Sequence, residues 1–126
     1  MTKIISSPNC GNSPKMEFLK DFNIAFAKRE VEYIAERVTD EIDWNIIGDR
    51  KIQGKKIFTA ELEQMKSEKM TELTIDQILS HGKIGAASGT MKMQNGKKYA
   101  FSDFYEFNGA KGSKIKSMTS YIIEIE

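Results

Sequence analysis

The chain has 126 residues, of which 40% are hydrophobic and 29% are charged. Its 19 Lys and Arg residues nearly balance its 18 Asp and Glu residues, so the formal net charge is +1. This length is typical of one domain with its own core. The near-neutral charge gives no electrostatic reason to expect a nucleic-acid or membrane-surface partner.

Cysteine usage and hydropathy restrict the class further. A single cysteine, Cys10, cannot form an internal disulfide bond. Because it lies in the polar stretch from Ser6 to Ser13, we expect an exposed thiol. No apolar run is long enough to span a membrane, and the first residues lack the apolar core of a secretory signal. A cytoplasmic protein is therefore expected.

The N-terminal half predicts a flexible lead-in and then helices. Residues 1–13 mix Ser, Asn, Gly and Pro and are expected to be mobile. Ser13 and Pro14 suit the N-cap and the first position of a helix. Aromatic residues then recur at helical spacing from Phe18 to Phe26.

A second short helix is expected from the apolar spacing of residues 31–38, and Thr39-Asp40-Glu41 is predicted to end it. The β-branched segment 42–47 predicts a strand, which returns through a turn at Gly48. Residues 55–69 place their apolar side chains on one side and predict a third helix.

The chain after Thr71 predicts four long strands. His81-Gly82, Asn95-Gly96 and the loop 109–112 separate them, and Asn-Gly between alternating segments is a strong hairpin signal. Adjacent strands should therefore form an antiparallel meander. The whole pattern predicts one α+β domain over residues 14–126, with three helices packed on a curved, mainly antiparallel sheet.

One predicted strand carries an acid among aromatic residues. Alternation places Tyr99, Phe101, Asp103, Tyr105 and Phe107 on the same face of the sheet. If this face points at the helices, Asp103 is a carboxyl group in an apolar environment, where it must pair, bond or take up a proton. It is then either a functional acid or a structural group satisfied by a neighbouring hydroxyl or amide.

Neighbouring segments can supply the walls of a pocket around this acid. Small residues leave room, and methionines adapt to irregular shapes. The expected ligand-binding residues are Phe22, Trp44, Ile46, Phe58, Met91, Phe101, Tyr105 and Met118. The alternative is that they form an ordinary close-packed core.

The opposite face of the last strands is also apolar. Phe104, Tyr121, Ile123 and Ile125 should point away from the helices, among small polar residues. Exposed apolar groups on a sheet face commonly seal against a second copy. We therefore expect a homodimer through this face.

These segments carry a family resemblance. DEIDWNIIG followed by QGKKI is similar to the first strand and third helix of the nuclear transport factor 2-like superfamily. SDFYEFNGAKGSKIKSM is similar to its aspartate-containing strand, turn and final strand. From about Pro14 onward, the chain resembles the SnoaL-like and ketosteroid isomerase-like members. The resemblance implies a cone-shaped fold whose bent sheet and three helices enclose a pocket.

The resemblance also implies which mechanisms could operate. Ketosteroid isomerase-like catalysis uses a base, a tyrosine and a protonated aspartic acid. Asp103 matches the last, whereas Ile46 and Phe22 occupy the other two positions, so that isomerisation is not expected. SnoaL-like cyclases carry an acid-base aspartate on this strand, and Asp103 matches its position. The epoxide hydrolases of the superfamily use an arginine and a second aspartate where this chain has Phe101 and Ser120.

The sequence therefore supports two hypotheses. The first is a small-molecule-binding protein in which Asp103 acts as general acid or hydrogen-bond donor on an apolar, carbonyl-bearing ligand, in an isomerase- or cyclase-type reaction. The second is a non-catalytic dimerisation or binding module with a filled interior. No cofactor motif and no metal-ligand spacing occurs in the sequence.

Overall fold

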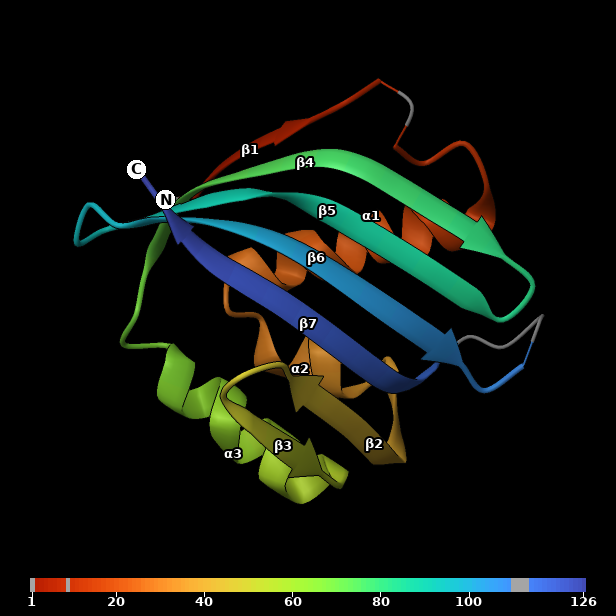
Figure 1. Cartoon of the computed structure of the whole chain (residues 1–126). Coiled ribbons are helices and arrows are strands. Elements are labelled where there is room, and N and C mark those ends of the chain that lie inside the picture. The colour runs from red at the N-terminus through yellow and green to blue at the C-terminus, as the bar shows by residue number, and fades with distance from the viewer. Residues whose placement is uncertain (1, 9, 110–113) are drawn as a thin grey trace.

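A computed structural model describes residues 2–8, 10–109 and 114–126. Over these residues the chain forms three helices and seven strands (Figure 1). The helices are α1 (Pro14–Ala27), α2 (Val31–Ala35) and α3 (Lys55–Met65). The strands are β1 (Lys3–Ser6), β2 (Val38–Ile46), β3 (Arg50–Gln53), β4 (Met70–His81), β5 (Ile84–Met93), β6 (Lys98–Phe107) and β7 (Ile115–Ile125).

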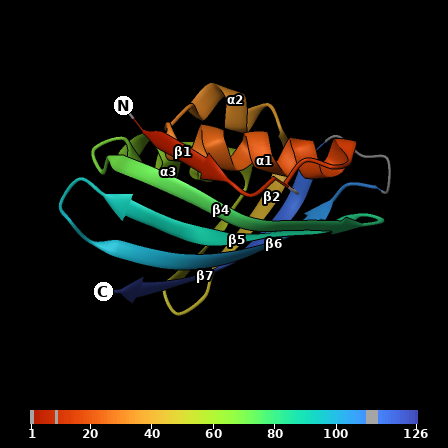
Figure 2. The same ribbon diagram turned by 90° about the horizontal axis from the view of Figure 1, so that it is seen from above.

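The strands form a single mixed sheet in the order β1-β4-β5-β6-β7-β2-β3. Strands β4 to β7 make the antiparallel meander expected from the turn residues, whereas β1 and β2 pair in parallel with β4 and β7. Figure 2 shows the three helices on one side of the sheet. The predicted α+β class, with helices on one face of a mainly antiparallel sheet, is confirmed.

Two irregularities in β4 contribute to the curvature of the sheet. Its register against β5 shifts between Met70 and Glu72 and again between Ile75 and Gln77. Such bulges bend a strand and increase its local twist. The sheet curves beneath the helices, with α1 lying over β4 and β5 (Figure 2).

Helix α1 begins as its sequence predicts. The Ser13 hydroxyl accepts a hydrogen bond from the backbone N–H of Met16 (3.2 Å), and Pro14 takes the first helical position. Leu19 and Phe22 are fully buried against the sheet. Helix α3 follows the turn residue Gly54, whose φ of 88° is a conformation that favours glycine.

The prediction of a mobile lead-in differs from the structure. Residues 3–6 form β1, and further bonds tie its ends to β4: the Thr2 hydroxyl donates to the Met70 carbonyl (2.8 Å) and the Ser7 N–H to the Ile75 carbonyl (3.0 Å). The expected exposed thiol is also wrong. Cys10 is only 7% exposed, because the chain folds back over β4 after β1.

The boundary between α2 and β2 also differs from the prediction. Val38 starts β2 and is fully buried opposite Ile115 of β7 instead of ending the second helix. Helix α3 ends at Met65, earlier than predicted. The expected loop 109–112 lies, except for Gly109, outside the described residues.

The sheet face away from the helices carries apolar side chains. We call Phe104, Tyr121, Ile123 and Ile125 the outer sheet face, and each of them is exposed, Ile123 by 67%. The rings of Phe104 and Tyr121 contact each other edge to face, with centroids 6.0 Å apart. Within the described part of the chain, no helix is long and apolar enough to cross a membrane.

Candidate functional site

A cavity of about 650 Å³ lies between the sheet and the helices. Its walls come from α1, α3 and the strands β2 to β7. Most of the predicted ligand-binding residues border it, together with the predicted acid Asp103: Phe22, Trp44, Ile46, Met91, Phe101, Tyr105 and Met118. A volume of this size lies within the range of small-molecule sites.

Phe58 is the predicted wall residue that does not border the cavity. It is fully buried on α3, and its ring packs edge to face against the Trp44 indole, which does border the cavity, with centroids 5.7 Å apart. Its spacing on α3 correctly indicates burial. The sequence pattern cannot indicate that Trp44 borders the cavity and Phe58 does not.

Asp103 reaches the cavity because of the strand alternation. In β6, Phe101 and Tyr105 are buried on the cavity side, and Phe104 is exposed on the other. Asp103 shares the side of Phe101 and Tyr105 and is half-buried. Its carboxyl group therefore borders the cavity beside Phe101 and Tyr105.

The first hydrogen bond to Asp103 comes from Tyr105. The Tyr105 hydroxyl donates to Asp103 Oδ2 at 3.3 Å, and Asn23 Nδ2 donates to the Tyr105 hydroxyl at 3.0 Å. Asn23 also donates to the Leu19 carbonyl (2.8 Å) in the turn before it. Because Asn23 supplies a hydrogen to the Tyr105 oxygen, the Tyr105 hydrogen is left to point at the carboxylate.

The second hydrogen bond comes from the adjacent strand β7. Ser120 lies opposite Asp103 in the β6–β7 register, and its hydroxyl bonds the carboxyl group. The indole Nε1 of Trp44 donates to Ser120 Oγ at 2.9 Å. Since an indole N–H can only donate, the Ser120 hydrogen is also directed at Asp103.

These surroundings have opposing effects on the acidity of Asp103. Burial raises the pKa of its carboxyl group, while the hydrogen bonds from Ser120 and Tyr105 lower it. Burial dominates, and the pKa rises from the ordinary 3.8 to about 6. Burial, followed by the nearby Asp103 charge, raises the Tyr105 pKa well above 10.0. Among the described residues, no Lys, Arg or His forms an ion pair with Asp103.

The positions that the family resemblance linked to catalysis are all at this site. Phe22 and Ile46 border the cavity and cannot ionise, so neither supplies the tyrosine or the base of a ketosteroid isomerase. Phe101 and Ser120 also border it, in place of the arginine and second aspartate of an epoxide hydrolase. Of these five positions, Asp103 alone carries a carboxyl group, and it borders the cavity.

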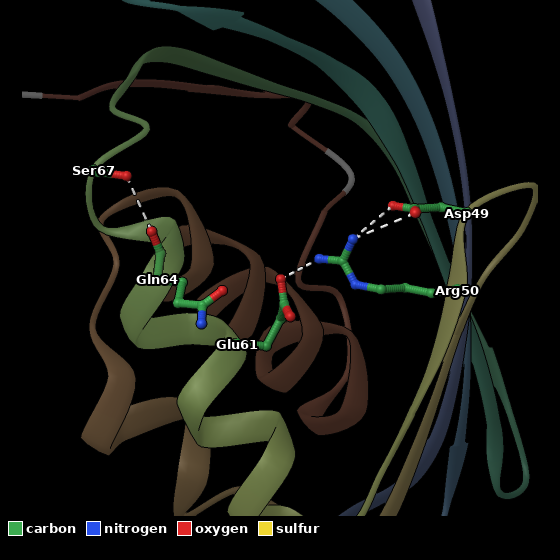
Figure 3. Close-up of polar contacts among 5 residues, drawn as sticks. All are labelled: Asp49, Arg50, Glu61, Gln64 and Ser67. Atoms are coloured by element: carbon green, nitrogen blue, oxygen red, sulfur yellow. Dashed lines mark hydrogen bonds and ion pairs between the residues drawn. The ribbon is translucent and has the colours of Figure 1, made fainter.

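Part of the cavity lining is polar and charged. Arg50 at the start of β3 reaches across to Glu61 on α3 and also bonds both carboxylate oxygens of Asp49 (3.3 and 3.1 Å; Figure 3). Just beyond α3, the Ser67 hydroxyl donates to the Gln64 carbonyl (3.1 Å). The Arg50 and Asp49 side chains are about half exposed, so these ion pairs add little to stability. They connect β3 to α3 along the cavity lining.

Sequence reasoning missed Asn23, and it named Ser120 without its hydrogen bonds to Asp103 and Trp44. Asn23 falls on the helix face of Leu19 and Phe22, where a buried polar residue needs a partner. That signal was available from the helical spacing. The bond between Trp44 and Ser120 depends on the parallel pairing of β2 with β7, which no local pattern reveals.

No metal centre is visible in the described part of the chain. No group of three or more His, Cys, Asp or Glu side chains is placed to hold a metal ion there. In the described ranges, every buried side-chain nitrogen or oxygen has a hydrogen-bond partner.

Sequence comparison finds no match: no protein-family profile and no curated protein matches the chain. Comparison with solved structures does find similar folds. An NTF2-like protein of unknown function from Cytophaga hutchinsonii has a TM-score of 0.66 and 23% identity, over 85% of this chain and 97% of that one.

Two similar structures have assigned activities. A protein assigned as a SnoaL-like polyketide cyclase, from Shewanella denitrificans, has a TM-score of 0.73 and 9% identity, covering 88% of this chain and 92% of that one. One assigned as a ketosteroid isomerase, from Kribbella flavida, has a TM-score of 0.73 and 14% identity, covering 87% and 78%. The chain thus has the nuclear transport factor 2-like fold shared by SnoaL-like and ketosteroid isomerase-like proteins.

Proposed function

We propose that the chain binds an apolar, carbonyl-bearing small molecule in the cavity and that Asp103 transfers a proton to or from it. The observation that carries this proposal is a carboxyl group without a counter-ion in the described chain, on the wall of a cavity of about 650 Å³, held by two oriented hydroxyls. The similar structures assigned as a cyclase and an isomerase are consistent with such chemistry.

The acidity of Asp103 suits proton transfer near neutral pH. A pKa of about 6 gives roughly ten carboxylates for each carboxylic acid at pH 7. General acid-base catalysis works best when the pKa of the group lies near the working pH. The carboxylate would remove a proton from the carbon next to the ligand carbonyl, and the acid so formed would return it at another atom.

The surroundings support this role by fixing the carboxyl group. Asn23 orients the Tyr105 hydroxyl and Trp44 orients the Ser120 hydroxyl. Two oriented donors hold Asp103 in one position, which reduces the reorganisation needed during proton transfer. The bond from Tyr105 is long at 3.3 Å and can yield to a ligand atom.

A non-catalytic binding or dimerisation module is the second candidate. It is favoured by the apolar residues Phe22 and Ile46, where a ketosteroid isomerase has two of its catalytic groups. Asp103 also has no second acid-base residue beside it at those positions to take part in proton transfer. The open cavity argues against a fully packed module, although it is equally compatible with binding alone.

Deuterium exchange separates the two candidates. The probe is 2-tetralone, a bicyclic ketone with exchangeable hydrogens beside its carbonyl, incubated in D₂O with the protein and followed by proton NMR. We expect wild-type protein to accelerate exchange about a hundredfold or more over the same concentration of acetate. Asp103→Asn should abolish the acceleration. Asp43→Asn, the same change at an exposed position on β2, should retain it.

The result that contradicts proton transfer is binding without exchange. If saturation-transfer NMR shows 2-tetralone bound to the wild-type protein but exchange is no faster than with acetate, the chain is a binding module. Native mass spectrometry of freshly purified protein supplies a further check. A retained small-molecule mass that disappears when Leu73, which borders the cavity, is replaced by the larger tryptophan (Leu73→Trp) would support a ligand at this site.

A further inference from the structure

Four aromatic rings form a continuous series along the cavity. In order they are Tyr105, Phe22, Phe26 and Trp44, with successive ring centroids 6.1, 5.6 and 5.5 Å apart. All four border the cavity. We call this series the aromatic arc. Its first and last contacts are edge to face, so successive rings turn and present faces in several directions.

Both ends of the aromatic arc lead to the same carboxyl group. Tyr105 donates directly to Asp103 at 3.3 Å. Trp44 donates to Ser120 at 2.9 Å, and Ser120 in turn bonds Asp103. Asp103 therefore closes the arc into a ring of contacts around part of the cavity.

Within this ring the charge of Asp103 is not balanced. Tyr105 on its own strand and Ser120 on β7 bond it, and Ala87 on β5 lies opposite it in the sheet. Asn23 on α1 and Trp44 on β2 lie behind these partners, bonded to Tyr105 and Ser120. None of them carries a positive charge. Neutral hydroxyls alone satisfy a carboxylate poorly where burial removes much of its hydration.

The other charged groups of the lining come from the segment after α1, from the start of β3 and the turn before it, from α3 and from the segment before β4. They are Arg29, Asp49, Arg50, Glu61, Glu68 and Lys69. Arg50 is held by Asp49 and Glu61, while Arg29 donates to the backbone carbonyls of Phe26 (3.0 Å) and Glu68 (2.8 Å). Their formal charges cancel, so Asp103 sets the net charge of the cavity when it is ionised.

We propose that this cavity binds organic ammonium ions that carry an apolar body, with Asp103 as counter-ion and the aromatic arc facing the cation. This ligand class goes beyond the proposed proton transfer and does not depend on it. Ring faces carry negative electrostatic potential and attract cations, most strongly where water is excluded. A quaternary ammonium has no N–H donor that would need an acceptor, and its apolar surface suits a cavity walled by rings and methionines.

An isosteric pair of probes tests the charge alone. Benzyltrimethylammonium carries a permanent positive charge, and neopentylbenzene is the neutral hydrocarbon of nearly the same shape. Trp44 is the sole tryptophan of the chain and borders the cavity, so its fluorescence reports occupancy. At pH 7.5 we expect the cation to bind at least about tenfold more tightly than the hydrocarbon.

Single substitutions test whether the cation binds at Asp103 and the aromatic arc. Asp103→Asn should weaken benzyltrimethylammonium binding about tenfold or more and change neopentylbenzene binding by less than about threefold. Phe26→Leu removes a ring of the arc at a half-buried position. It should also weaken binding of the cation more than binding of the hydrocarbon. Asp43→Asn should leave both affinities unchanged, because Asp43 is exposed on β2 and does not border the cavity.

The pH dependence gives a test on wild-type protein that requires no variant. Because the probe is permanently charged, its affinity should rise up to about tenfold between pH 5 and pH 7.5, as Asp103 ionises with a pKa of about 6. The single histidine, His81, is not part of the lining and cannot produce this change. Neopentylbenzene binding should not strengthen over the same range.

Three results would overturn the proposal. They are no detectable binding of benzyltrimethylammonium, equal affinity for the two probes, or cation binding that Asp103→Asn leaves intact. Each is independent of deuterium exchange into 2-tetralone. The cation site and the proton-transfer function can therefore fail separately, and each failure is recognisable.

Discussion

Replacing Asp103 by asparagine should change the free energy of unfolding by an amount that depends on pH. Burial raises the Asp103 pKa to about 6 in the folded chain, from an ordinary 3.8. The unfolded chain therefore ionises this group more readily, so raising the pH favours unfolding. The stability that the protonated group contributes is fully present below pH 3.8 and is lost as the pH rises through 6. Asparagine does not ionise, so the Asp103→Asn variant does not lose this stability as the pH rises.

The size of the effect follows from the two pKa values. One pKa unit corresponds to about 1.36 kcal/mol, so the gap between 3.8 and about 6 amounts to about 3 kcal/mol once the group is fully ionised. About 2 kcal/mol of this develops between pH 4 and pH 8, because the unfolded group is already partly ionised at pH 4. A weakened bond to Ser120 or Tyr105 costs about 1 kcal/mol at both pH values and cancels in the comparison.

Urea unfolding followed by far-UV circular dichroism at pH 4 and pH 8 measures this difference. The unfolding free energy of Asp103→Asn, relative to that of wild type, should be about 2 kcal/mol higher at pH 8 than at pH 4. Asp43→Asn is the matched control, because that side chain is exposed on β2. A pH-independent effect of Asp103→Asn, or one that is more destabilising at pH 8, would show that the hydrogen bonds outweigh burial and would refute the reasoning.

Three further predictions concern the sheet. Gly89→Ala should destabilise by at least about 2 kcal/mol in urea unfolding, because a Cβ there would collide with the Thr74 carbonyl oxygen of β4. Ser120→Ala should lower the unfolding free energy by about 1–3 kcal/mol and raise the Asp103 pKa above 6, since it removes a buried donor; an unchanged pKa by NMR would contradict this. We also propose that the outer sheet face joins two copies of the chain. Sedimentation should then show a wild-type dimer and an Ile123→Lys monomer, whereas a wild-type monomer at micromolar concentration would contradict it.

Local periodicity predicted much of this structure. Strand alternation has a period of two, so one acid among aromatic residues in β6 placed Asp103 on the cavity side. The same argument placed Phe104 and Ile123 outside. The turn residues predicted the meander of β4 to β7 because each hairpin is a local structure.

Long-range pairing accounts for what the sequence did not predict. Strand β1 has only four residues and forms by parallel pairing with β4, which is far away along the chain. Its attachment explains why Cys10 is buried despite polar neighbours. Val38 has a helical spacing to Ile34, but its place opposite Ile115 in the sheet overrides that pattern. The hydrogen bond from Trp44 to Ser120 likewise depends on the pairing of β2 with β7.

The central claim is that Asp103 is a carboxyl group of raised pKa on the wall of a cavity. The most direct test is a ¹³C NMR titration of its side-chain carboxyl carbon, assigned as the signal that Asp103→Asn removes. The account predicts a midpoint at about pH 6. A midpoint at or below the ordinary 3.8 would contradict it, because the hydrogen bonds from Ser120 and Tyr105 would then dominate over burial.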